Sequence, residues 1–118
     1  YMIVSYSSSP MWIMSLIKAK FKLDDVCGNV VESVNGIVTG KLLEKVDRYA
    51  KADRLKKFMQ KNSINKENVW VVGDSVTDLP MAELGHFIAF NAEKDEVRKK
   101  AEFLVDKKDL REVLRYLE

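Results

Sequence analysis

The sequence contains very little cysteine, histidine or proline: among 118 residues there are one Cys, one His and two Pro. A single cysteine, Cys27, forms neither an internal disulfide nor a cysteine-rich metal site, so we expect a reducing, cytoplasmic location rather than secretion. A single histidine, His86, means that any Ser-His-Asp triad would have to use that residue. These scarcities exclude disulfide-rich folds and cysteine-based zinc sites.

The sequence also lacks an excess of one charge and a long apolar run. Twenty Lys and Arg residues are balanced by eighteen Asp and Glu residues, and the net charge of +2 gives no reason to expect nucleic-acid binding. The first 17 residues carry no charge, but they lack the basic start of a signal peptide, and Ser7 to Pro10 interrupts their apolar run. We therefore expect no targeting segment and no membrane span. With 47% hydrophobic and 32% charged residues, the composition is typical of one globular domain, here residues 1–118.

What the sequence does contain is a regular alternation of strand-like and helix-like segments. Short apolar runs bounded by turn residues predict strands at 1–6, 69–72, 87–90 and 103–105. Apolar side chains at helical spacing predict helices at 10–22, 47–62, 76–84, 94–101 and from residue 110 onward. Continuously apolar strands that alternate with helices favour an α/β fold: a Rossmann-like parallel sheet with helices on both faces.

Local signals refine this pattern at three places. Ser9 precedes Pro10 and is predicted to cap the helix that follows. Gly85 is predicted at the C-terminal cap of the helix at 76–84. The dipeptide Asn35-Gly36 is the strongest short-range hairpin signal, and it predicts a hairpin over residues 30–39 that forms a local flap.

Two loops are the candidate ligand sites, because ligands bind beyond the carboxyl ends of the strands in such a sheet. The first contains Ser7, Ser8 and Ser9, directly before a helix whose unpaired N–H groups and positive dipole suit a phosphate. The alternative for these serines is a helix cap in an ordinary polar loop. The second loop, residues 73–78, follows the strand at 69–72.

Asp74 and Asp78 lie four residues apart in the second loop, one just past the strand and one in the first turn of the next helix. This spacing directs both carboxylates to the same edge of the sheet, and two carboxylates beside phosphate and water suit Mg²⁺. The alternative is that Asp74 is a turn residue and that Asp78 or Thr77 caps the helix. Lys51 opens the helix at 47–62 and by itself indicates only a surface lysine.

The tripeptide Gly73-Asp74-Ser75 also occurs in serine esterases of the GDSL type, where the serine is the nucleophile. Here the only histidine, His86, follows Ser75 by eleven residues, and Glu83 rather than Asp precedes it by three. A triad would need all three groups together. His86 is more simply interpreted as a strand-edge residue.

Taken together, these segments resemble the haloacid dehalogenase superfamily, and within it the phosphoserine phosphatase-like branch. Its G-D-x-x-x-D signature after a strand is matched by V-V-G-D-S-V-T-D-L-P-M at 71–81. I-A-F-N-A at 88–92 and D-L-R-E-V-L at 109–114 are also similar to that branch. Ser7 matches the signature of a strand that ends in serine, with Ser5 as the rival, and Lys51 in Y-A-K-A-D-R-L matches the lysine that opens a helix.

The resemblance implies a role for each matching residue in phosphoester hydrolysis through an aspartyl-phosphate intermediate. Asp74 would bind Mg²⁺, and Asp78 would hold Lys51 or a metal-bound water. Lys51 would neutralise the charge of phosphate and carboxylates, and Ser7 with the Ser8 N–H would bind the phosphoryl oxygens. The catalytic set would then contain Lys51 and Asp78, and the metal set Asp74 and Asp78. The substrate would be phosphoserine or another small phosphorylated metabolite.

The sequence departs from the family in one respect: no D-x-D-x-T motif, which carries the nucleophile, occurs in these 118 residues. The resemblance places that motif and a substrate-specifying cap before this chain, on a central strand between the strands at 1–6 and 69–73. We therefore expect a partial core domain that is inactive alone and belongs to an intact phosphatase with a missing N-terminal segment. Two alternatives remain open. One is a non-catalytic phosphate- or Mg²⁺-binding module or complementing subunit, and the other is a remnant whose strands 1–6 and 69–73 pair directly or self-associate.

Overall fold

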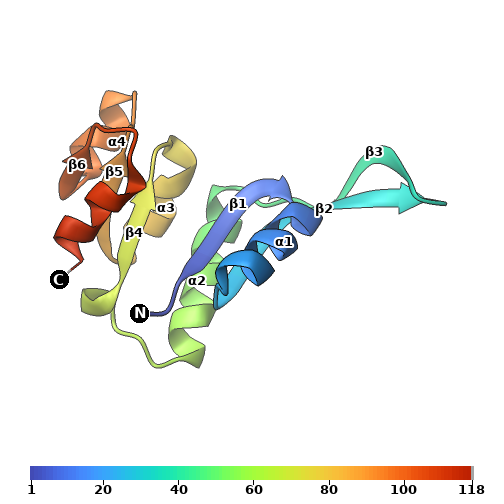
Figure 1. Ribbon diagram of the computed structural model, residues 1–118, viewed down its shortest axis with the longest axis horizontal. Helices are drawn as coiled ribbons and strands as arrows, with labels where there is room; N and C mark the ends of the chain where they lie inside the picture. The colour runs from blue at the N-terminus through green and yellow to red at the C-terminus, as the bar shows by residue number, and fades with distance from the viewer. Residues whose placement is uncertain (118) are drawn as a thin grey trace.

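Two three-stranded sheets form the framework of the chain (Figure 1). The computed structural model describes residues 1–117. The first sheet has the order β1 (Val4–Pro10), β2 (Asp25–Val34) and β3 (Ile37–Glu44). The second has the order β4 (Trp70–Gly73), β5 (His86–Phe90) and β6 (Phe103–Val105). All ladders are parallel except the β2–β3 hairpin, which confirms an α/β fold built on parallel strands.

The helices follow the predicted order and differ in their lengths. The α-helices are α1 (Met11–Phe21), α2 (Arg48–Lys61), α3 (Leu79–Ala82) and α4 (Asp95–Lys100). The 3₁₀ segments are η1 (Lys66–Asn68), η2 (Val76–Asp78) and η3 (Leu110–Tyr116). The helix predicted at 76–84 is therefore a 3₁₀ turn followed by one α-helical turn, and the last segment is 3₁₀ rather than α-helical. In that last segment only Val113 is buried, while Leu110 and Leu114 are exposed, so little packing supports a longer helix.

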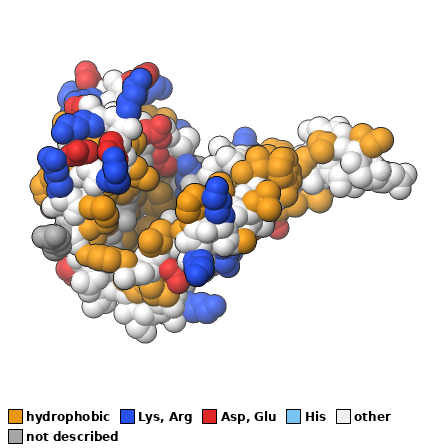
Figure 2. Space-filling view, viewed as in Figure 1, with side chains coloured by type: hydrophobic (Ala, Val, Ile, Leu, Met, Phe, Trp, Pro, Cys, Tyr) orange, Lys and Arg blue, Asp and Glu red, His pale blue; other side chains and the backbone are white. Residues whose placement is uncertain are grey.

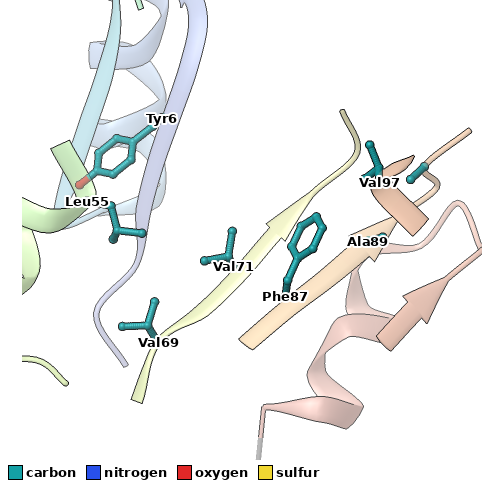
Figure 3. Packing of buried hydrophobic residues seen from close by; sticks show 8 residues of the cluster. Tyr6, Leu55, Val69, Val71, Phe87, Ala89 and Val97 are labelled. Carbon is teal, nitrogen blue, oxygen red and sulfur yellow. The ribbon is translucent and has the colours of Figure 1, made fainter. Parts of the chain in front are cut away.

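Side chains of the second sheet alternate between two apolar layers, as its continuously apolar strands require. On one face, Val71 and Phe87 join a core that includes Leu55 of α2 and Val97 of α4 (Figure 3). On the other face, Ile88 packs with residues of β6 and η3 in a second cluster. This alternation confirms that the sheet is covered on both sides.

β1 and β4 are the facing edges of the two sheets, yet no ladder joins them within residues 1–117. Tyr6 of β1 and Val71 of β4 nevertheless belong to one core cluster, which Leu55 of α2 also joins (Figure 3). The helix therefore holds the two halves together where strand pairing does not. Direct pairing of the segments 1–6 and 69–73 within the chain is wrong.

The β2–β3 hairpin extends away from the rest of the molecule as an arm (Figure 1). The turn lies at Asn35-Gly36 with positive φ at both residues, as predicted, but the hairpin is longer than residues 30–39. Residues 25–29, which were not predicted as a strand, form the first half of β2 and pair with β1. The arm is thus a continuation of the sheet rather than a separate flap, and every residue of β3 is exposed. Hydrophobic side chains gather over the α1 and β2 region in Figure 2.

Three local predictions at segment ends are corrected by the structure. β1 continues through the serines to Pro10, although its register with β2 shifts after Tyr6, so the serines lie in a strand and not in a loop. Ser9 does not cap α1: the N-cap residue is Pro10, no side chain caps the helix, and the Ser9 hydroxyl accepts from the Ser7 hydroxyl. α3 ends with Glu83 at its C-cap, and Gly85 serves a close approach instead: a Cβ there would lie 2.5 Å from the Val69 carbonyl oxygen.

His86 lies at the start of β5, and the structure excludes it from a triad with Ser75. Its Nδ1 is 2.7 Å from a carboxylate oxygen of Glu102, and its ring stacks on Trp70 with centroids 4.7 Å apart. Ser75 follows β4 at the opposite, carboxyl end of the same parallel pair.

No helix within residues 1–117 combines the length and apolar character needed to cross a membrane.

The Glu102 contact gives a testable pH dependence. The hydrogen bond with Glu102 raises the pKa of His86 above its ordinary value. Because the folded-state pKa is raised, this contact stabilises the fold below the unfolded pKa and loses its effect as pH rises through the folded pKa. NMR titration of the single histidine should give a pKa above that of an unfolded histidine, and Glu102→Gln should lower it. A Glu83→Gln control should leave it unchanged, and an equal shift in both variants would contradict the assignment.

Candidate active site

The loop after β4 is organised by the buried carboxylate of Asp78, which is 7% exposed. Its Oδ2 accepts hydrogen bonds from the backbone N–H of Asp74 at 3.1 Å and of Ser75 at 3.2 Å. The Ser75 hydroxyl in turn accepts from the Thr77 N–H, which completes a capping box at η2. The capping interpretation of this loop named Asp78 or Thr77 as the cap, but the N-cap residue is Ser75, and Asp78 supplies the reciprocal bond of the capping box.

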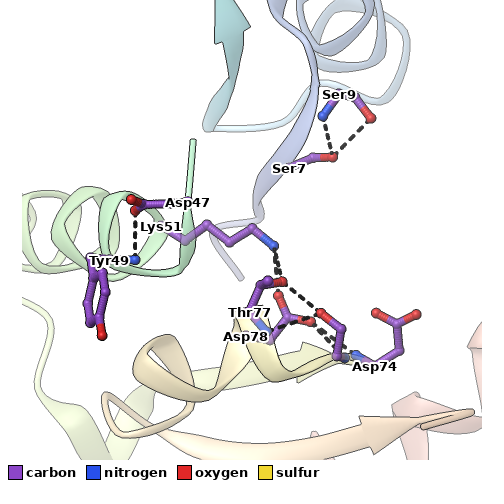
Figure 4. A network of polar contacts seen from close by, with 9 residues as sticks. Ser7, Ser9, Asp47, Tyr49, Lys51, Asp74, Thr77 and Asp78 are labelled. Carbon is purple, nitrogen blue, oxygen red and sulfur yellow. Dashed lines mark hydrogen bonds and ion pairs between the residues drawn. The ribbon is translucent and has the colours of Figure 1, made fainter. Parts of the chain in front are cut away.

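Lys51 reaches the same carboxylate from α2 (Figure 4). Asp47 caps that helix by accepting from the N–H groups of Tyr49 and Ala50, so the helix begins one turn before the lysine. The Lys51 Nζ lies 2.9 Å from Asp78 Oδ1 and donates to the Thr77 hydroxyl at 3.3 Å. Lys51 is only 8% exposed, so it is not the surface lysine that its position alone indicates.

Asp78 therefore has both carboxylate oxygens occupied by chain partners, one by an ammonium group and one by two N–H groups. Such a carboxylate is held to orient Lys51 and the loop, and it has little remaining capacity to ligate a metal directly. The contact between Lys51 and Asp78 joins two residues that are 27 positions apart in the sequence.

Asp74 has the opposite character, because it is exposed at the carboxyl end of β4. Its side chain makes no hydrogen bond or ion pair with any residue of the described chain 1–117, and in Figure 4 it stands beside the Asp78 network. No group of three or more His, Cys, Asp or Glu side chains within those residues forms a metal site. A free carboxylate next to a bound lysine fits Mg²⁺, which takes one or two carboxylates and completes its shell with phosphate and water.

The serines of β1 approach the site from the other side of Lys51 (Figure 4). The Ser7 hydroxyl donates to the Ser9 hydroxyl at 3.0 Å and accepts from the Ser9 N–H at 3.0 Å. The Ser8 carbonyl accepts from the side chain of Asn29 at 2.8 Å, while the Ser8 side chain is exposed. Neither Ser7 nor Ser8 is bonded to Lys51 or Asp74 among residues 1–117, so the serines are not joined directly to the Lys51–Asp78 pair.

Sequence reasoning gave no role to two residues that build this site. Asn29 of β2 donates to the Ser8 carbonyl and accepts from the Val46 N–H at 2.6 Å, so it ties the serine segment to the chain entering α2. Gly73 allows Asp78 to pack against the end of β4, because a Cβ at Gly73 would lie 2.6 Å from Asp78 Oδ2. The position of Gly73 directly before Asp74 was a signal for this close approach, whereas nothing in the sequence marked Asn29.

A shallow groove adjoins Asp74 at the carboxyl edge of the second sheet. It runs between the loops that follow β4 and β5, and its walls are formed by Asp74, Ser75, Val76, Asn91, Glu93 and Lys94. Of the candidate site residues, only Asp74 borders this open groove.

Comparison with known proteins agrees with this geometry. The sequence model of the haloacid dehalogenase-like hydrolase family matches residues 2–83. A phosphoserine phosphatase of Lactococcus lactis is 36% identical over 108 residues, covering 90% of this chain and 50% of that protein. One of Methanocaldococcus jannaschii is 36% identical over 103 residues, covering 86% of this chain and 48% of that protein.

Solved structures give the same result in three dimensions. A phosphoserine phosphatase in its apo form superposes with a TM-score of 0.92 at 31% identity, covering 100% of this chain and 60% of that one. A substrate-bound phosphoserine phosphatase gives a TM-score of 0.91 at 30% identity, with 57% of its chain covered. The chain spans about half the length of the curated relatives it matches. With its fold, its β4 loop and its matched residues in agreement, the chain belongs to the haloacid dehalogenase-like hydrolase family.

Proposed function

We propose that this chain supplies the phosphate- and Mg²⁺-binding half of a phosphomonoester hydrolase of the phosphoserine phosphatase type. The observation that carries the proposal is the buried Lys51–Asp78 pair beside the exposed carboxylate of Asp74 at the carboxyl edge of the sheet. Phosphoryl transfer depends on positioning and on charge stabilisation, and this arrangement provides a fixed cation next to a free anionic ligand. The substrate is a small phosphorylated metabolite such as phosphoserine, and the setting is the cytoplasm.

Each residue has one task in this proposal. Asp74 holds Mg²⁺, which supplies Lewis-acid stabilisation of the phosphoryl oxygens. Lys51, held by Asp78, offsets the negative charge of the phosphate. Ser7 and the Ser8 N–H donate to the phosphoryl oxygens once the Ser7 hydroxyl turns from Ser9. Asp78 acts as the residue that orients Lys51 rather than as a metal ligand.

The nucleophile comes from a segment outside these 118 residues, because the sequence contains no D-x-D-x-T motif. A carboxylate of that segment attacks phosphorus and breaks its bond to the alcohol oxygen, which takes a proton from a second acidic group of the segment; that group regains a proton from the water of the next step. Water then attacks the phosphorus of the acyl phosphate, releasing inorganic phosphate and regenerating the carboxylate. Such a strand pairs with β1 and β4, the facing edge strands of the two sheets. We call a polypeptide that contains this chain and that segment the completed protein, and the chain alone is expected to be inactive.

A second candidate function follows from the same missing motif. The chain would bind phosphate or Mg²⁺ without chemistry, or complement a separate nucleophile-bearing chain, and its open strand edges would favour self-association. This candidate predicts saturable phosphate binding in the presence of Mg²⁺ but no phosphate release from any monoester by any single polypeptide that contains the chain.

Substitution of Asp74 separates these candidates. In the completed protein, Asp74→Asn should abolish Mg²⁺-dependent release of phosphate from phosphoserine and other monoesters, because the amide removes the anionic ligand while keeping the shape. Asp106→Asn is the matched control: Asp106 is also exposed but lies after β6, where it pairs with Arg98. Wild-type activity in Asp74→Asn would contradict the assignment of the metal ligand.

A further inference from the structure

Three side chains form a polar network next to the candidate site, and the proposed chemistry does not use them. Asp25 of β2 accepts hydrogen bonds from Arg54 of α2 at both carboxylate oxygens, at 2.8 and 2.7 Å. The Tyr6 hydroxyl of β1 donates to Asp25 at 2.9 Å. The network therefore joins the strand that carries the serines to the helix that carries Lys51.

The position of each member relates it to a residue of the site. Tyr6 directly precedes Ser7 on β1 and is 8% exposed within the core cluster. Arg54 lies three residues after Lys51, so the two side chains leave neighbouring turns on one side of α2. Moving α2 along or across the sheet would therefore change the Lys51 position and stretch the Arg54–Asp25 pair together.

Asp25 shares one side of β2 with Asn29, since residues an even number of positions apart point the same way along a strand. Asn29 ties the Ser8 carbonyl to the Val46 N–H just before α2, and Asp25 ties Tyr6 to Arg54 one turn beyond Lys51. The two contacts bracket Lys51 along the sequence, so β2 fixes the helix on both sides of the lysine.

We propose that Asp25 is a positioning residue, which fixes α2 and hence Lys51 relative to Ser7 through its two-point pair with Arg54 and its bond from Tyr6. A two-point arginine–carboxylate pair defines direction as well as distance, which an apolar contact does not. The Arg54 side chain is 49% exposed but that of Asp25 only 14%, so loss of Arg54 leaves a largely buried carboxylate without its cation, whereas Asp25→Asn removes the charge itself. The hydrogen bonds from Arg54 hold the pKa of Asp25 below its usual range, so the pair stays charged at neutral pH.

The first test measures catalysis by the completed protein, and in this readout the inference rests on the proposed function. Asp25→Asn and Arg54→Met should each lower kcat by about tenfold, because small misplacements of a catalytic group are costly. The double variant should lose no more kcat than either single variant, since both substitutions break the same Arg54–Asp25 pair. The melting temperature should change little in Asp25→Asn and should fall in Arg54→Met, so kcat is compared per folded molecule. The Asp106→Asn control, which breaks another two-point pair, that of Asp106 with Arg98, should leave kcat unchanged. Unchanged kcat in Asp25→Asn, or multiplied losses in the double variant, would overturn the inference.

The second test does not depend on turnover. The Lys51 ammonium is buried against Asp78, so its ¹⁵N resonance reports on that pair. Asp25→Asn should change the chemical shift of this resonance and speed the exchange of the Lys51 ammonium protons with water, whereas Asp106→Asn should do neither. If the wild type hydrolyses no phosphomonoester, the proposed function fails and this resonance alone decides the inference: a change in Asp25→Asn supports it, and an unchanged resonance overturns it.

Discussion

Replacing Lys51 with methionine is expected to destabilise the fold and to remove catalysis. The substitution leaves the Asp78 carboxylate, 7% exposed, without its cation. Breaking a buried pair from one side costs about 3 kcal/mol of the free energy of unfolding, because the remaining charge stays desolvated. The loss of the cation should also reduce kcat of the completed protein by about 10²- to 10³-fold. Chemical denaturation and initial-rate kinetics measure the two effects separately.

A second substitution separates the two effects of Lys51→Met. The double variant Lys51→Met/Asp78→Asn removes the buried charge but keeps an oxygen that accepts the N–H bonds of Asp74 and Ser75. It should regain most of the stability and none of the activity. Lys57→Met, an exposed lysine on the same helix, is the control and should change neither. Full activity in the double variant would show that Lys51 has only a structural role.

The substitution Gly73→Ala is expected to disturb the site from the strand beneath it. The added Cβ would lie 2.6 Å from Asp78 Oδ2 and 2.7 Å from its Cβ, so Asp78 must move. Overpacking of this kind costs about 1–3 kcal/mol of the free energy of unfolding. Because Asp78 also holds Lys51 and the Asp74 and Ser75 N–H groups, kcat should fall as well, by more than the folded fraction explains.

Gly85→Ala provides the matched comparison. The added Cβ would lie 2.5 Å from the Val69 carbonyl oxygen, an overlap as severe as that in Gly73→Ala. Gly85 lies directly before β5, away from the site. It should lower stability while the kcat per folded molecule stays at the wild-type value. Equal loss of kcat per folded molecule in both variants would contradict the specific link between Gly73 and Asp78.

The parts of the fold that were predictable from the sequence are those where one physical signal is dominant. β5 and β6 are continuous apolar runs, and Asn35-Gly36 takes the positive φ values that a tight hairpin needs. The first half of β2 was missed because Asp25, Gly28 and Asn29 are poor strand formers. Their presence there reflects contacts from the other elements: Asp25 and Asn29 bond α2 and β1, and a Cβ at Gly28 would lie 2.6 Å from the Ser9 carbonyl oxygen.

The site shows the same division between local and tertiary signals. The spacing of Asp74 and Asp78 correctly placed both in one loop after a strand. It did not show that they differ, with one carboxylate exposed and the other buried under Lys51. That difference arises from α2, which is distant in sequence, and only the family resemblance indicated that Asp78 holds the lysine.

The most direct test of the proposed function is the release of inorganic phosphate from phosphoserine by the completed protein after complete removal of divalent cations, followed by addition of Mg²⁺. We predict no turnover without the metal and recovery in proportion to site occupancy when Mg²⁺ is returned, because Asp74 alone cannot stabilise an anionic phosphate. Turnover that persists without divalent cations would contradict the account. So would a folded completed protein that binds Mg²⁺ and releases phosphate from no monoester.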